Sequence, residues 1–568
     1  MRALHTPGFS SRCLAPAILL TASITTPTTG CREPDGNATY LIENASIFTA
    51  DPERPWAEAI AIEGDRILAV GTAEEIAAHA GPGTVRIDAA QGMLTPGFVD
   101  AHVHFLEGGF RLSSVQLRDA ATPEAFGRRI RDFAATVDPG TWITGGDWNH
   151  ENWGGELPDR AWIDALTPEN PVWVHRLDGH MALANTMALE AAGLPTGEGA
   201  EVPVVDGGTL VADASGRLTG VLKDNAMSLV AAAMPEPASE LEDRALDAAM
   251  AHVARFGVTS VHHLGTWDDL EVFRRAHDAG RLRTRIYAAV PLESWPRLAE
   301  HVAREGRGDE WLRIGGLKGF VDGSLGSHTA AFFEPFTDAP EDRGLLVNSH
   351  EDLKSWIEGA DAAGLHVIVH AIGDRANADL LDLYQDAITA NGPRERRFRI
   401  EHAQHLRSAE LPRFAELGVI ASMQPYHAID DGSWAERVIG PERSRTTYAF
   451  RSLIDAGATL AFGSDWFVAP PIPAEGIYAA ITRRTLDDTN PQGWVPEQKI
   501  SLTEALFAYT RNGAYASFEE GIKGALAPGR LADLALFERD LRALDPVELE
   551  DARVLLTMVG GRIVHDAR

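Results

Sequence analysis

The residues best suited to chemistry are imidazoles and carboxylates that lie at the ends of apolar segments. His102 and His104 are separated by one valine at the end of the segment Leu94–His104. Side chains two positions apart in a strand share a face, so both imidazoles can point to the same side. The pair alone leaves two interpretations open, because histidines at strand ends serve as metal ligands and as hydrogen-bonded core residues.

Four further candidate ligands lie at the ends of other apolar segments: Lys318, His370, His402 and Asp465. Nitrogen and oxygen donors of this kind suit zinc or a similar divalent ion better than copper(I). A lysine ammonium cannot coordinate a cation, but a carbamate formed on Lys318 by CO2 could bridge two ions. The alternative is an ion pair between Lys318 and Asp322. The sequence therefore predicts a site for one or two divalent ions, with zinc as the default.

These ligands need elements that bring them together. Eight apolar, strand-like segments alternate with amphipathic stretches along the chain: Leu94–His104, Val258–Leu264, Thr284–Val290, Ile314–Val321, His366–His370, Phe398–His402, Val419–Met423 and Thr459–Gly463. This alternation is typical of repeated βα units and a parallel sheet. Eight such units predict an α/β fold, a closed (β/α)8 TIM barrel whose active site lies at the C-terminal ends of the strands.

Two regions fall outside this repeat. Short alternating strands in 38–96 and again in 524–568 predict one discontinuous β-sandwich domain made from both termini, around a barrel at 97–523. About 150 residues separate the first two barrel strands, where a short crossover would suffice. We therefore expect a mixed α/β insert after strand 1, at about 105–234, folded over the barrel mouth.

The first residues have the order of a secretory signal. Arg2 and Arg12 precede the apolar run 13–20, and Gly30 and Cys31 follow a Ser/Thr/Pro-rich stretch. The run is shorter than the roughly 20 residues that a membrane-spanning helix needs. We predict a signal peptide at 1–31 and export to the periplasm, or anchoring at the cell envelope through a lipid on Cys31. Ordinary signal cleavage is the alternative to lipidation.

Composition limits the partners. The chain has 51 Lys and Arg against 82 Asp and Glu, a formal net charge of −31. This charge repels phosphate backbones and anionic membrane surfaces, so nucleic acid is excluded as an expected partner. Acidity alone indicates solubility more often than it indicates a substrate. The two cysteines, Cys13 and Cys31, both lie in the predicted leader, so no thiolate of the remaining chain can hold the metal. The sequence does not indicate an oligomeric state.

Five segments together resemble the amidohydrolase superfamily: 96–104 (PGFVDAHVH), Lys318 ahead of 322–327 (DGSLGS), 370–374 (HAIGD), 400–404 (IEHAQ) and 462–466 (FGSDW). More narrowly, the chain resembles the branch of amidohydrolase family 3 that contains N-substituted formamide deformylase. The resemblance runs from about Ala38 to the C-terminus. Ordered agreement at several strand ends is specific for the superfamily and much less specific for the substrate.

The resemblance implies a role for each candidate ligand. His102 and His104 would bind a first metal ion, and His370 and His402 would bind a second. Lys318, as a carbamate, would bridge the two ions. The cofactor implied is thus one or two Zn²⁺ held at the ends of the barrel strands.

Asp465 would ligate the first ion, accept a proton from the attacking water and return it to the leaving nitrogen. His180 and Trp148 resemble family positions near the substrate, although buried packing is the alternative for Trp148. The segment 424–427 (QPYH) follows the seventh strand and is expected to face the mouth, with Gln424 as its candidate substrate residue. Asp322 completes the candidate substrate residues. Glu401, not counted among them, is expected either to orient an imidazole or to be ion-paired.

The predicted function is hydrolysis of a non-peptide amide C–N bond in a small molecule by a metal-activated water. Ester or lactone hydrolysis at the same site is one alternative, since a metal-activated water attacks either carbonyl. A catalytically inactive surface lipoprotein that binds a ligand is a second. A carbohydrate- or peptide-binding module is a third, suggested by five tryptophans in the predicted insert: Trp142, Trp148, Trp153, Trp162 and Trp173.

Overall fold

The computed structural model describes residues 37–199 and 201–568. The predicted signal peptide at 1–31, with Cys31, lies outside the described residues. Within the described part of the chain, no helix combines the length and the apolar character that crossing a membrane requires.

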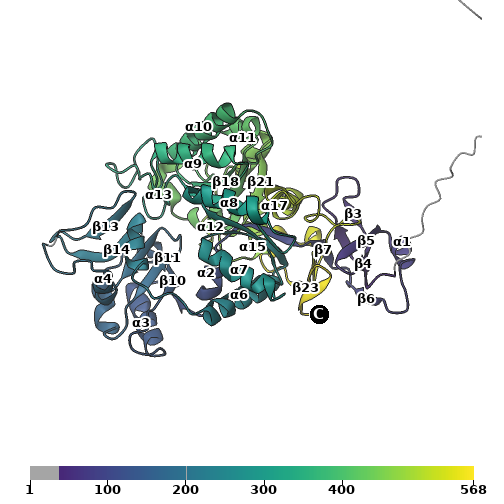
Figure 1. Ribbon diagram of the computed structural model, residues 1–568, viewed down its shortest axis with the longest axis horizontal. Helices are drawn as coiled ribbons and strands as arrows, with labels where there is room; N and C mark the ends of the chain where they lie inside the picture. Colours follow the sequence, from purple (N-terminus) through teal and green to yellow (C-terminus); the bar gives the residue numbers. More distant parts are fainter. Residues whose placement is uncertain (1–36, 200) are drawn as a thin grey trace, which may run out of the picture. The chain divides into compact units, whose positions relative to one another are not determined.

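Eight parallel strands form the central sheet, in the order β21-β20-β19-β18-β17-β16-β15-β8. Figure 1 labels two of these strands, β18 and β21. Their bounds are Phe98–Val103 (β8), Val258–Leu264 (β15), Arg285–Pro291 (β16), Leu312–Phe320 (β17), His366–Ala371 (β18), Arg399–His402 (β19), Ile420–Met423 (β20) and Thr459–Phe462 (β21). A parallel bridge between Val103 and Trp466 joins the first strand to the segment after the last. The predicted TIM barrel is therefore confirmed.

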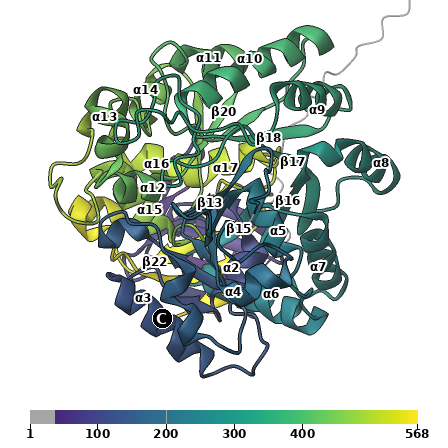
Figure 2. The same cartoon turned by 90° about the vertical axis from the view of Figure 1, so that its left-hand side faces the viewer.

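Almost every barrel-strand residue is buried, as expected where helices cover the outer face of a parallel sheet. Figure 2 shows these helices arranged around the strands. They include α6 (Ser239–Ala254), α7 (Trp267–Asp278), α8 (Trp295–Glu305), α9 (His350–Ala362), α10 (Asp374–Asn391) and α11 (Leu411–Leu417). The C-terminal ends of all eight strands therefore meet at one face.

Seven predicted barrel strands agree with the structure to within two residues at each end. The first prediction, Leu94–His104, is wrong because two strands meet there. Residues Met93–Pro96 form β7, which pairs with β2 (Ser46–Phe48) and β22 (Leu534–Phe537) rather than with the barrel. The chain changes sheet at Gly97, where a Cβ atom would lie 2.2 Å from Thr259. A glycine permits this close approach.

The segments near both termini form two sheets. One has the order β5-β4-β1-β6 and the other β24-β23-β22-β7-β2-β3. The strands not yet introduced are β1 (Tyr40–Glu43), β3 (Trp56–Ala57), β4 (Ala59–Glu63), β5 (Arg66–Gly71), β6 (Val85–Asp88), β23 (Val554–Val559) and β24 (Arg562–Asp566). Side chains of both sheets share one apolar cluster, which includes Ile42, Ile60, Leu94 and Leu534. The predicted domain boundaries, 38–96 with 524–568 and 97–523, stay predictions.

The chain between β8 and β15 builds a sheet of its own, in the order β13-β14-β12-β11-β10-β9. Its strands are β9 (Val115–Gln116), β10 (Gly145–Trp148), β11 (Trp173–Arg176), β12 (Met181–Ala184), β13 (Gly208–Ala212) and β14 (Leu218–Asp224). This insert contacts the loop after β17, because Lys223 Nζ donates to the Ser327 carbonyl at 2.8 Å. The turn between β11 and β12 consequently lies beside the C-terminal ends of the barrel strands.

Candidate metal centre

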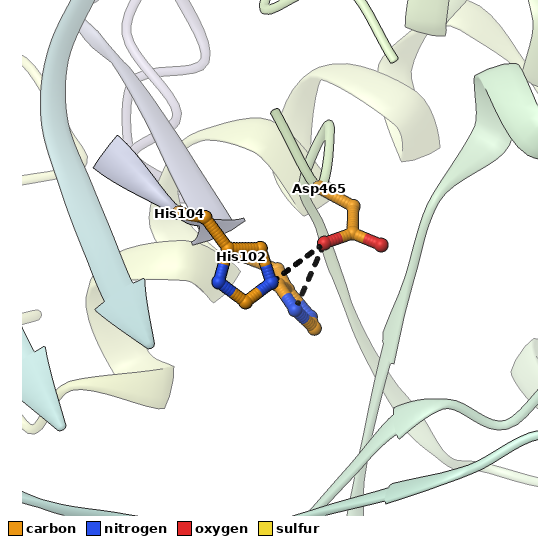
Figure 3. A group of neighbouring side chains, drawn as sticks. All are labelled: His102, His104 and Asp465. Carbon is orange, nitrogen blue, oxygen red and sulfur yellow. Dashed lines mark ion pairs between the residues drawn. The ribbon is translucent and has the colours of Figure 1, made fainter. Parts of the chain in front are cut away.

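His102, His104 and Asp465 converge where the first and last barrel strands meet. The Asp465 amide donates to the His102 carbonyl at 2.7 Å, and the His104 amide donates to the Trp466 carbonyl at 2.7 Å. These bonds place Asp465 Oδ1 3.2 Å from His102 Nε2 and 3.3 Å from His104 Nε2 (Figure 3). Two imidazoles and one carboxylate from segments far apart in sequence thus form one cluster.

Hydrogen bonding fixes which nitrogen of His102 is available. His102 Nδ1 lies 2.6 Å from Glu401 Oε2, and both side chains are fully buried. Glu401 also accepts hydrogen bonds from Arg399 Nε and Ser422 Oγ, each at 2.8 Å. The carboxylate therefore holds the proton on Nδ1 and leaves the lone pair of Nε2 free, as carboxylates commonly do behind metal-binding histidines. Glu401 therefore orients the imidazole of His102, and not that of the adjacent His402.

The lone pair of His102 Nε2 consequently faces Asp465 Oδ1, another acceptor, at 3.2 Å. Lys318 Nζ lies 3.3 Å from the same nitrogen, whereas Asp465 Oδ1 has no hydrogen-bond partner among the described residues. The donor set of two imidazole nitrogens and one carboxylate oxygen is one that zinc and related divalent ions prefer. The residues present therefore fit a metal ion.

A second cluster shares Asp465. Donor atoms of His402, His427 and Asp465 all lie within 4.8 Å of one another. His427 belongs to α12 (Pro425–Asp431), directly after β20, and we had not predicted it as a ligand. A histidine four residues beyond a barrel strand is a weak sequence signal, because only the first turn of the following helix brings it back over the mouth.

Two candidate ligands have left-handed backbones, with φ of +69° at His402 and +60° at Asp465. This conformation costs a non-glycine residue about 1–2 kcal/mol, so it persists only where the surroundings impose it. Such strain concentrates at functional sites, where it directs side chains that regular strands would point elsewhere.

Lys318 and His370 border these clusters. Lys318 Nζ lies 3.3 Å from His102 Nε2, and burial lowers the pKa of Lys318 to about 8. His370 Nε2 donates to the Gly323 carbonyl at 3.0 Å, so Nδ1 is the nitrogen left for a metal. Its ring centroid is 4.6 Å from that of His402. All six predicted ligands therefore gather at the mouth of the barrel.

A cavity opens onto this centre. Its lining includes residues of the barrel loops and of the insert: Asn149, Arg176, Asp178, His180, Ser324, His370, His402, Gln404, His427, Asp430, Asp431, Trp434 and Asp465. Convergent polar groups in a cavity beside candidate metal ligands are typical of a site for a small molecule.

Of the four predicted substrate residues, His180 alone lines this cavity. Its Nδ1 lies 2.7 Å from Asp224 Oδ1. Burial by itself would lower the pKa of His180, but the hydrogen bond and charge of Asp224 outweigh burial and raise it. With Nδ1 held by Asp224, Nε2 is the nitrogen of His180 that remains for a ligand.

Trp148, Asp322 and Gln424 lie elsewhere. Trp148 is fully buried in the insert core, where its Nε1 donates to the Val174 carbonyl at 2.9 Å, so the packing interpretation describes it. Asp322 is also fully buried and accepts three backbone amides, from Ala331, Ile372 and Gly373, at 2.7–3.0 Å. It thereby fixes loops rather than facing a ligand.

Gln424 is fully buried as well, with its Nε2 3.4 Å from His102 Nδ1. It lies behind a candidate ligand and outside the cavity lining. The side chain that does face the cavity from this segment is His427.

The chain belongs to the amidohydrolase family. The sequence profile of that family, described as "Amidohydrolase family", matches residues 86–565. The relative LONG AFTER FAR-RED 3 of Arabidopsis thaliana is 39% identical, over 93% of this chain and 92% of its own. N-substituted formamide deformylase of Arthrobacter pascens is 28% identical, over 93% of this chain and 98% of its own.

Among solved structures, an uncharacterized metal-dependent hydrolase from Pyrococcus horikoshii OT3 superposes with a TM-score of 0.73 at 27% identity. The superposed region covers 89% of this chain and 99% of the Pyrococcus chain. The predicted amidohydrolase resemblance is thus confirmed. Membership in the family, together with the His and Asp clusters, supports a metal-dependent hydrolase activity at a divalent-metal site.

Proposed function

We propose that this amidohydrolase cleaves a non-peptide amide C–N bond in a small molecule, with zinc as the metal. The observation that carries the proposal is the cluster of His102, His104 and Asp465, in which Asp465 Oδ1 lies 3.2 Å and 3.3 Å from the two Nε2 atoms, beside a cavity. The relative named N-substituted formamide deformylase, which matches over 93% of this chain, supports the choice of an amide bond.

His102 and His104 would hold one ion, His370 and His402 another, with Asp465 as a shared neighbour. A divalent ion bound there supplies Lewis acidity, which lowers the pKa of water to about 7 and polarises a carbonyl oxygen. Asp465 accepts the proton that the attacking water loses and delivers it to the leaving nitrogen. An amide requires this second transfer, because an unprotonated nitrogen is a poor leaving group.

Lys318 is proposed to carry the bridging carbamate. Formation of a carbamate from CO2 requires the neutral amine, and the pKa of about 8 gives Lys318 a larger neutral fraction at physiological pH than an ordinary lysine has. Burial beside His102 also shields the product from water. We further propose export of the protein, with a lipid on Cys31 as its membrane attachment.

His180 is proposed to donate a hydrogen bond from Nε2 to the substrate. Asp224 supports this role because its carboxylate binds Nδ1 and raises the pKa of His180, which favours the doubly protonated ring that donates from both nitrogens. A donor at this position would stabilise oxygen or nitrogen atoms that gain electron density during the reaction.

The test is a paired substrate series on zinc-restored protein. The purified chain is stripped with a chelator, reloaded with zinc and assayed on N-formyl and N-acyl amines beside esters of matched shape. We expect amide turnover that disappears on chelation and returns with zinc. Turnover of esters alone would replace the amide proposal with ester hydrolysis. No turnover of either class by zinc-loaded protein would leave the ligand-binding alternative.

A further inference from the structure

We propose that His427 is a metal ligand, and that His402, His427 and Asp465 form a second three-donor site sharing Asp465 with the first. This inference rests on the proposed metal-dependent activity and extends its ligand set. The resemblance to the amidohydrolase superfamily had pointed to His102, His104, Lys318, His370, His402 and Asp465, without His427.

Three consecutive barrel strands deliver the donors. His402 ends β19, His427 lies in the first helical turn after β20, and Asp465 follows β21. Donor atoms of all three lie within 4.8 Å of one another. The rings of His402 and His427 are nearly parallel, at 12°, with centroids 6.2 Å apart. This spacing leaves room for an ion between nitrogen atoms at the ring edges, with the carboxylate beside it.

Each residue of this cluster has a polar atom without a hydrogen-bond partner. His402 Nδ1, His427 Nε2 and Asp465 Oδ1 are each buried and unpartnered among residues 37–199 and 201–568. Buried side-chain polar atoms nearly always have a partner, so three such atoms in one place require an explanation. One cation satisfies all three at once, since each offers a lone pair.

A purely structural histidine in this barrel has a different pattern. His366 is buried, and its Nδ1 lies 2.9 Å from Tyr287 Oη while its Nε2 lies 2.8 Å from the Arg397 carbonyl. Both of its ring nitrogens are therefore used within the fold. His427 leaves Nε2 unused at the cavity wall. His262 Nε2 is also unpartnered but does not line the cavity, so the position of His427 at the wall is what favours a ligand.

His427 would also complete the second ion's surroundings. His370 Nε2 is already bonded to the Gly323 carbonyl, which leaves this ring a single nitrogen for the metal. With His427, the protein donors of the second ion would come from β18, β19, the helix after β20 and the segment after β21, in addition to the carbamate proposed on Lys318 of β17.

The test measures metal binding without relying on activity. Wild type, His427→Gln and the control His277→Gln, a half-exposed histidine on α7, are equilibrated in zinc buffers of graded free concentration. Zinc per chain is then measured by elemental analysis, and circular dichroism verifies folding. We expect His427→Gln to keep one ion and bind the other more than ~100-fold more weakly, beyond the ~10–100-fold that losing an outer-sphere partner costs. The control should bind zinc as wild type does.

Two results would overturn the inference. One is unchanged zinc affinity in folded His427→Gln with a raised KM, which would make His427 a substrate contact. The other comes from zinc-loaded wild-type crystals, a measurement that needs no variant. Anomalous scattering should place an ion about 2.0–2.1 Å from His427 Nε2, and an ion beyond bonding distance contradicts the inference. Wild type that binds no metal would instead contradict the proposed function itself.

Discussion

The cavity has two walls that use their polar groups differently. The barrel wall includes His370, His402, His427 and Asp465, and the insert wall consists of Asn149, Arg176, Leu177, Asp178 and His180. On the barrel wall, donor atoms of His402, His427 and Asp465 have no hydrogen-bond partner among the described residues. On the insert wall, the charged groups are already paired, as where Arg176 Nη1 lies 2.7 Å from Asp178 Oδ2. Unsatisfied groups are available to a ligand, whereas satisfied groups hold their neighbours in place. The barrel wall therefore offers groups that can bind a metal or a substrate, whereas the groups of the insert wall mainly maintain the shape of the cavity.

His180 is the exception on the insert wall, because Asp224 occupies only one of its nitrogens. The insert thus contributes one side chain to the reaction and many to its framework. Substitutions on the two walls should accordingly affect different measurements.

The largest effect is expected from Asp465→Asn on the barrel wall. The amide keeps the shape of the side chain but cannot accept the proton, and general acid–base catalysis contributes about 10²–10⁴-fold. We expect kcat for the best amide substrate to fall by ~10³-fold or more. Asp278→Asn on α7, where the carboxylate is 81% exposed, is the matched control and should leave kcat unchanged. Wild-type kcat in Asp465→Asn would remove this residue from the mechanism.

Glu401→Gln should have the next largest effect. The substitution removes the charge that holds the proton on His102 Nδ1, and loss of such a partner costs ~10–100-fold in metal affinity. Zinc titration of the stripped protein measures it. Glu416→Gln, exposed on α11, is the control. Equal zinc affinity in both variants would show that Glu401 serves packing only.

Asp178→Asn should affect stability and leave zinc binding intact. Asp178 is paired with Arg176 and accepts from Ser324 and Ser327, and breaking a buried pair costs about 3–5 kcal/mol. Chemical denaturation measures the free energy of unfolding, and elemental analysis measures zinc. A variant with normal stability that has lost zinc would show that Asp178 supports metal binding, contrary to the role given to the insert wall.

The stability of Asp178→Asn should also depend on pH differently from that of wild type. Burial alone would raise the pKa of Asp178, but Arg176 and neighbouring hydroxyls lower it to about 2, from 3.8. A lowered folded-state pKa means stability that is present above pH ~4 and lost as the pH falls toward 2. We expect wild type to lose this contribution across that range and Asp178→Asn to lack it. Denaturation midpoints at pH 2–6 measure the difference.

The smallest effect on activity is expected from Trp148→Phe. The substitution removes the hydrogen bond from Nε1 to the Val174 carbonyl, worth about 1 kcal/mol, within the insert core. We expect a lower Tm with KM and kcat near wild type. A tenfold rise in KM would return Trp148 to the substrate site and break the comparison between the walls.

The barrel could be predicted from sequence because strands buried on both faces are nearly continuous apolar runs. Their ends also marked the candidate ligands, since side chains at the C-terminal ends of barrel strands share one mouth. We predicted β7 and β8 as one strand. The chain changes sheet at Gly97 because β7 pairs with β22, which lies near the other terminus and cannot be identified from the local sequence.

Inside the insert, sequence patterns could not assign side chains to faces. Trp148 is an aromatic residue near a strand end whether it packs inward or outward, and its burial depends on Phe126 and other insert residues around it. His427 was not predicted as a ligand, for a related reason. Its position depends on how α12 begins after β20, which no periodicity in the sequence describes.

The measurement that tests the central claim most directly is zinc per chain in wild-type protein, determined before and after chelation on samples assayed in parallel for N-formyl amine hydrolysis. We predict about two zinc ions per chain and hydrolysis that rises and falls with zinc content. A folded wild-type chain that binds no divalent ion, or that hydrolyses the amide equally well without one, would contradict the account.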